Sequence, residues 1–87
     1  MEVVFSESES RYELRSGEEL VGFADVVVSG ERMEFPYVFV EPRFRNQGHG
    51  ETLVRQALED ARSRGLEPVP QCPYVVAYVR RHPGVLK

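Results

Sequence analysis

The sequence predicts one small α+β domain with the element order ββββαβα and a sheet that is mainly antiparallel at its start. Residues 1–40 hold runs of β-branched and aromatic residues that are separated by short polar turns. After residue 48 the apolar residues change to a helical period, and a second helical run follows a short strand. A chain of 87 residues suffices for one domain with a modest core, so we assign residues 1–87 to a single domain.

Four strands are expected in the first half of the chain. They are residues 3–5, 11–15, 20–29 and 33–40, and the turns between them contain Gly or Ser. Strands joined by such short turns form an antiparallel meander. In the second strand, Tyr12 and Leu14 lie on one face. Pro36 in the fourth strand cannot donate a ladder hydrogen bond, which predicts an edge or a bulge at that point.

Two helices and a short strand are expected in the second half. An apolar face predicts the first helix, and it consists of Leu53, Val54, Ala57, Leu58 and Ala61. Glu51 and Arg55 have the spacing of an i,i+4 ion pair, and Gly65 ends the helix. Residues 66–70 form the short strand. The second helix spans residues 73–82, with Pro73 in a favourable first position and basic residues in the last turn.

Composition argues against several classes of protein. No apolar run reaches about 18 residues and the first ten residues do not resemble a signal peptide, so we expect neither a membrane span nor secretion. The only cysteine, Cys72, cannot form an internal disulfide, which favours a reducing, cytoplasmic location. The net charge of −3 argues against general nucleic-acid binding. Residues 42–87 carry +4 against −7 for residues 1–41, which indicates either a local anionic ligand or scattered solvated charge.

The strongest local signal is the segment "RFRNQGHGETLV" (residues 43–54). Gly48 and Gly50 allow backbone N–H groups to turn toward one point at the start of a helix, and Arg43 and Arg45 add positive charge. The pattern predicts a phosphate or pyrophosphate site, or else a tight strand-to-helix turn with solvated arginines. The segment lacks the Gly-Lys-Ser/Thr of nucleoside triphosphatases, and its place after the fourth strand disfavours a dinucleotide site. No metal site is predicted, because nothing pairs with His49.

Two ordered motifs resemble the GNAT superfamily of N-acetyltransferases. Residues 45–50, with the sequence "RNQGHG", match its Arg/Gln-x-x-Gly-x-Gly/Ala loop, and "PYVFVEP" before them is similar to the strand that precedes that loop. Downstream, "PQCPYVVAYVRRHP" (residues 70–83) resembles the small single-domain, YjdJ-type branch of the superfamily. The resemblance spans the chain from about residue 3 to residue 84.

The resemblance implies acetyl-CoA as the cosubstrate and transfer of its acetyl group to an amine. The residues that would hold the CoA pyrophosphate are Arg45, Asn46, Gln47, Gly48, His49, Gly50 and Glu51. The backbone of Val38, Phe39 and Val40 would bind the pantetheine arm as an added strand, which fits a bulge at Pro36. Two positions depart from the family pattern. Asn46 replaces a common Gly and tolerates a left-handed backbone, whereas Tyr37 replaces a common His and leaves the general base open.

Acetyl transfer needs hydrogen-bond donors for the carbonyl oxygen, a neutral amine and an acid for the departing thiolate. The candidates for the acid are Tyr74 and Tyr78, and those for the base are Tyr37, Glu34, Glu41 or a chain of water molecules. Cys72 precedes a helix N-terminus, which favours the thiolate. It is expected to carry the acetyl group in a two-step route or to line the acceptor pocket. The alternative is a small buried residue at the strand–helix junction.

The expected function is that of an acetyl-CoA-dependent N-acetyltransferase whose amine acceptor, a small molecule or a protein, the sequence does not specify. One alternative is a non-catalytic module that binds or senses CoA or acetyl-CoA, and another is an interaction subunit that keeps only the fold. Because little chain surrounds the acceptor site, we expect a shallow, open acceptor pocket. We also expect a monomer or a weak homodimer.

Overall fold

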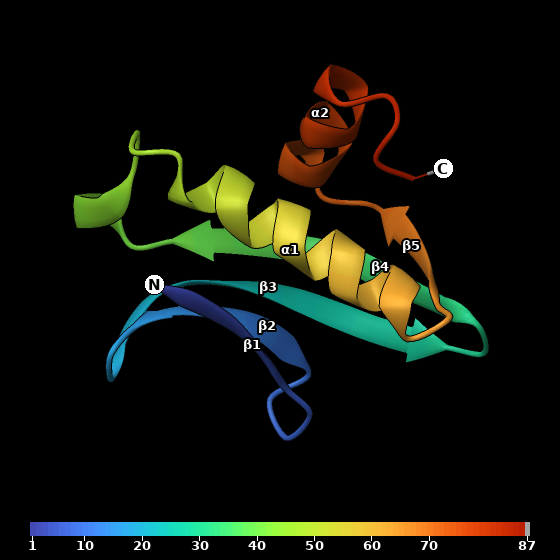
Figure 1. Cartoon of the computed structure of the whole chain (residues 1–87), viewed down its shortest axis with the longest axis horizontal. Coiled ribbons are helices and arrows are strands. Elements are labelled where there is room, and N and C mark those ends of the chain that lie inside the picture. Colours follow the sequence, from blue (N-terminus) through green and yellow to red (C-terminus); the bar gives the residue numbers. More distant parts are fainter. Residues whose placement is uncertain (87) are drawn as a thin grey trace.

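A computed structural model describes residues 1–86, in which five strands form one sheet that is crossed by helix α1 (Figure 1). The strands are β1 (Glu2–Ser6), β2 (Arg11–Ser16), β3 (Glu19–Ser29), β4 (Arg32–Val40) and β5 (Glu67–Pro70). A 3₁₀ turn (Pro42–Phe44) precedes helix α1 (His49–Ser63), and helix α2 (Pro73–Arg81) follows β5. The predicted order ββββαβα is confirmed. Among the described residues, neither helix has the length and apolar character needed to cross a membrane.

The sheet has the strand order β1-β2-β3-β4-β5. The first four strands pair antiparallel with their sequence neighbours, which confirms the predicted meander. β5 returns parallel to β4 after the crossover through α1, as a strand–helix–strand unit requires. The parallel pairing is short, because it joins only Arg32–Phe35 to Glu67–Pro70.

The predicted irregularity at Pro36 is a bulge in β4. Asp25 of β3 pairs with Tyr37, and Val27 pairs with Glu34, so one residue of β3 lies opposite two residues of β4. The extra residue allows Pro36 to stay inside a strand without interrupting the pairing on either side. β4 is therefore an inner strand up to Phe35, and from Pro36 onward it has no partner on the β5 side.

Helix α1 contacts all five strands and supplies much of the core. Its predicted apolar face is buried, and Tyr12 and Leu14 of β2 are buried in the same core, each at 1% exposure. The Tyr12 hydroxyl donates to Asp60 Oδ2 over 2.6 Å, and Arg64 Nε donates to the same atom over 2.6 Å. Burial, followed by the hydrogen bond to the Asp60 carboxylate, raises the pKa of Tyr12, so its hydroxyl stays a donor at all ordinary pH values.

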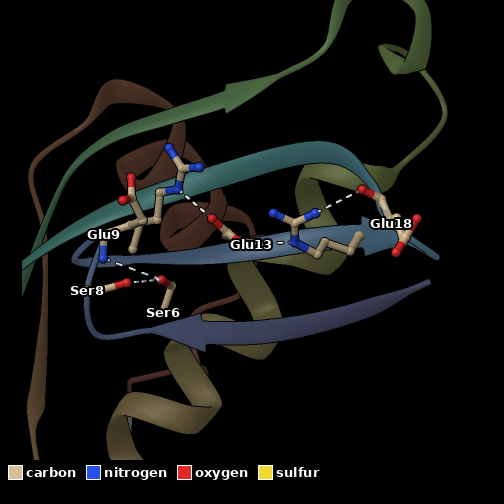
Figure 2. A network of polar contacts seen from close by, with 7 residues as sticks. Ser6, Ser8, Glu9, Glu13 and Glu18 are labelled. Carbon is tan, nitrogen blue, oxygen red and sulfur yellow. Dashed lines mark hydrogen bonds and ion pairs between the residues drawn. The ribbon is translucent and has the colours of Figure 1, made fainter.

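The face of β2 away from Tyr12 carries a small network of charges (Figure 2). Glu13 accepts hydrogen bonds from Arg11 Nε over 2.8 Å and from Arg15 Nε over 2.9 Å. Burial acts to raise the pKa of Glu13, but these two hydrogen bonds outweigh it and hold that pKa below its usual range. The network covers this side of β2 with side chains from the strand itself.

Candidate functional site

A pocket of about 520 Å³ lies where the end of β4, the loop after it, the start of α1 and helix α2 meet. This volume falls in the range of small-molecule sites. All the residues that the sequence predicts as cofactor-binding line it, except Gln47. Tyr37 and Tyr74, two of the predicted catalytic residues, line it as well. Residues from four separate elements thus converge on one concave surface.

The loop before α1 has the backbone that the glycine pattern predicts. Asn46 and Gly48 are left-handed, with φ of 62° and 81°, which confirms that Asn46 tolerates this conformation. Gly48 is the N-cap of α1 and offers no side-chain cap. The first backbone bond of the helix runs from the Thr52 N–H to the Gly48 carbonyl. The N–H groups before it are therefore available to an anion at the positive end of the helix dipole.

The pocket also contains the free edge of β4. Pairing with β5 ends at Phe35, and the Cys72 N–H then donates to the Phe35 carbonyl over 3.0 Å as the chain turns into α2. Beyond that point, Val38, Phe39 and Val40 pair only with β3. Arg45 Nε donates to the Val40 carbonyl over 2.8 Å, so one acceptor of this stretch is already engaged. The remaining backbone groups on this side face the pocket without a neighbouring strand.

Two arginines and one carboxylate set the charge of the pocket. Arg45 and Arg81 line it, and Arg81 pairs with Glu51, another lining residue, over 3.5 Å. The predicted pair of Glu51 with Arg55 is wrong, because Arg55 pairs instead with Glu59 over 3.8 Å. Arg43, expected to add charge to the loop, pairs with Glu19 and is not among the lining residues.

Tyr74 is the phenol that enters the pocket. Its hydroxyl lies against the backbone of Gly50, in the first turn of α1, at a position where a Cβ atom would overlap it. Burial, and then the charge of Glu51, raise the pKa of Tyr74, whereas Arg81 acts in the opposite direction. Tyr78, one turn later, is buried in the core at 3% exposure, and its ring stacks on His82 with a centroid distance of 4.2 Å.

The other predicted site residues occupy different surroundings. Cys72 is the N-cap of α2 and belongs to the apolar core at 8% exposure, and it does not line the pocket. Tyr37 lies at the pocket rim with half of its surface exposed. Gln47 turns back to donate to the Arg43 carbonyl over 3.2 Å. The roles predicted for these three residues stay predictions.

Two of the lining residues, Phe44 and Arg81, are not among the site residues that the sequence predicts. Phe44 belongs to the 3₁₀ turn, which no periodicity marks, and it meets the His49 ring edge-on with a centroid distance of 6.1 Å. Arg81 has the position of a helix C-terminal charge. Only the crossing of α2 over the start of α1 brings it to the pocket.

Comparison with known proteins assigns this chain to a family. The profile of the GCN5-related N-acetyl-transferase family matches residues 11–87. Among solved structures, the chain is similar to the ribosomal-protein-S18-alanine N-acetyltransferase from Escherichia coli, with a TM-score of 0.71 and 17% sequence identity. The match covers 88% of this chain and 53% of that enzyme, so the chain spans about half of its length. At this identity the likeness shows the fold alone. No curated protein sequence matches the chain.

The contact between Gly50 and Tyr74 gives a direct test of the pocket. A methyl group in Gly50→Ala would overlap the Tyr74 hydroxyl and lie 3.0 Å from its Cζ. Because the overlap is with the end of a side chain, we expect the Tyr74 ring to move while the fold stays intact. Ring ¹H–¹³C NMR signals of Tyr74 should shift, and those of Tyr12 should not.

Gly84→Ala is the control for this substitution, because a Cβ atom there meets nothing within 4 Å. An unchanged Tyr74 signal in Gly50→Ala would contradict the contact. A loss of cooperative unfolding in that variant would show that the whole fold requires glycine at position 50, and not only the position of the Tyr74 side chain.

Proposed function

The chain belongs to the GCN5-related N-acetyltransferase family, and we propose that it transfers the acetyl group of acetyl-CoA to an amine. The predicted superfamily is confirmed by the family match, whereas the YjdJ-type branch stays a prediction. One observation carries the proposal. An uncapped helix N-terminus and the free edge of β4 open into the same pocket, so a ligand with both a phosphate and an extended amide chain can use both.

Acetyl-CoA fits these residues as a substrate. Its pyrophosphate would lie on the backbone amides of residues 46–51, beside Arg45. Its pantetheine arm would run back along Val38–Val40, where β4 lacks a neighbour on one side. The acetyl end would then point toward the Pro36 bulge, where β5 separates from β4.

The residues of the pocket divide the chemistry between them. Backbone N–H groups at the free edge of β4 would donate to the carbonyl oxygen as it gains negative charge. Tyr74 would donate its proton to the departing thiolate, because it lines the pocket from α2, two residues after the Cys72 N–H that bonds to Phe35, and its raised pKa keeps it protonated. Tyr37, exposed at the rim, is where the amine would enter and lose its proton, directly or through water.

We assign Cys72 a packing role beneath the acetyl end and not the role of an acyl carrier. Its N–H donates to the Phe35 carbonyl, which places it at the point where β4 and β5 separate. Its side chain is turned into the core and does not line the pocket. Direct transfer from acetyl-CoA to the amine therefore needs no thioester on the protein. The acceptor would approach from the open rim, which suits an amine on a flexible or large partner.

Tyr74→Phe should lower kcat by about 10²-fold, the lower range of general acid catalysis, with little change in the KM for acetyl-CoA. The assay is thiol release from acetyl-CoA with a panel of amines and peptides. Because the pKa of Tyr74 is raised, the Tyr74 hydroxyl keeps its proton at every pH below the usual tyrosine pKa of about 10 and loses it only at a higher pH. The wild type should therefore show no tyrosine-dependent loss of rate below about pH 10.

Tyr78→Phe, measured in the same assay, tests the other candidate for the general acid. A large loss of kcat in Tyr78→Phe, with Tyr74→Phe near wild type, would reverse the assignment of the acid. No thiol release with any acceptor, combined with binding of CoA, would favour the non-catalytic binding module over the enzyme.

Cys72→Ser should retain most of the wild-type kcat, because serine preserves the volume of a residue that packs beneath the site. Intact-protein and peptide mass spectrometry after incubation with acetyl-CoA should find no acetyl group on Cys72. An acetylated Cys72 that disappears on addition of an amine, together with an inactive Cys72→Ser variant, would establish the two-step route instead.

A further inference from the structure

The two edges of the sheet differ in whether they can accept another strand. β5 forms one edge, and Pro68 and Pro70 within its four residues have no N–H to donate. β1 forms the other edge, and its sequence EVVFS contains neither proline nor lysine. Its pairing with β2 runs from Glu2 to Ser6 without a register shift, so no bulge twists this edge away from an approaching strand. Natural sheets usually protect an exposed edge by one of these devices.

Each face of the β1 edge carries at least one apolar side chain that is not buried. Val4 is 41% exposed on the face that carries Glu13, its partner across the β1–β2 ladder. Val3 and Phe5, on the opposite face, are only half-buried and open onto a groove of about 440 Å³ between β1 and α1. An apolar strand with free backbone groups and an uncovered flank is a site for pairing with another strand.

We propose that the β1 edges of two copies of this chain pair antiparallel, so that the two sheets become one across a two-fold axis at Val4. In this register each Val4 faces its counterpart, Val3 faces Phe5 and Glu2 faces Ser6 of the second copy. All five residues of the strand are paired, and no like charges stand opposite each other. Each copy also brings its Val3 and Phe5 to the open end of the other's groove.

A second copy is favoured over other occupants because the strand is complementary to itself in this register. The prolines of β5 prevent the alternative head-to-tail pairing of β1 with β5, which would propagate into fibres. The result is a closed dimer and not an open chain. The proposed acetyl-CoA pocket is lined by residues of β4 and α2. Strands β2 and β3 separate β4 from β1 in the sheet (Figure 1), so the dimer is independent of the proposed function.

Sedimentation equilibrium of the full chain tests the dimer. The wild type should approach twice the monomer mass at concentrations up to about 1 mM. Val4→Lys should weaken the association by about tenfold or more, because two like charges then meet at the axis. The fold should tolerate this change, since Lys at position 4 lies beside Glu13, and circular dichroism would verify it. A wild type that stays monomeric, or a Val4→Lys variant that dimerises equally well, would overturn the proposal.

Disulfide trapping tests the register. In Val4→Cys the two introduced thiols face each other, so mild oxidation should give a covalent dimer, while the buried Cys72 of the wild type should not. Val27→Cys is the matched control, because Val27 is 50% exposed but lies on β3, away from the edge. Equal cross-linking of both variants would mean random collision and would overturn the proposed pairing.

Discussion

The hydrogen bonds between β4 and β5 end at Phe35, and the candidate site depends on this early separation. A continued ladder would have satisfied the backbone of Val38–Val40 and filled the space where the pocket lies. The bulge at Pro36 adds a residue to β4. The Cys72 N–H donates to the Phe35 carbonyl, and this is the last hydrogen bond between the two segments before the chain turns into α2. The site is thus a place where secondary structure stops and leaves peptide groups for a ligand.

The rest of the small domain holds that opening in place. Helix α1 contacts every strand, so its N-terminus is fixed relative to the end of β4. The hydrogen bond from Tyr12 to Asp60 anchors the far end of the same helix to β2. Helix α2 adds Val75 and Tyr78 to the core and thereby brings Tyr74 and Arg81 over the pocket. A rigid scaffold around an unpaired strand is what a binding site on so short a chain requires.

The features that could be predicted from the sequence are those that local chemistry determines. Strand runs, the period of α1, Pro73 at the start of α2 and the glycine loop all carry local signals, and each is in its predicted place. What could not be predicted depends on how α2 crosses α1. That crossing places Arg81 beside Glu51, buries Tyr78 and directs the Cys72 side chain into the core. Residues on one helix face look equivalent in sequence, and only packing separates Tyr74 from Tyr78.

The central claim is that one ligand uses both the loop before α1 and the free edge of β4. Titration of ¹⁵N-labelled protein with CoA, followed by amide NMR, tests it most directly. The account predicts that the largest shifts fall on residues 38–40 and 46–51, while the amides of β1 and β2 stay unchanged. Binding that shifts other amides, such as those lining the groove beside β1, or the absence of any shift at saturating CoA, would contradict it.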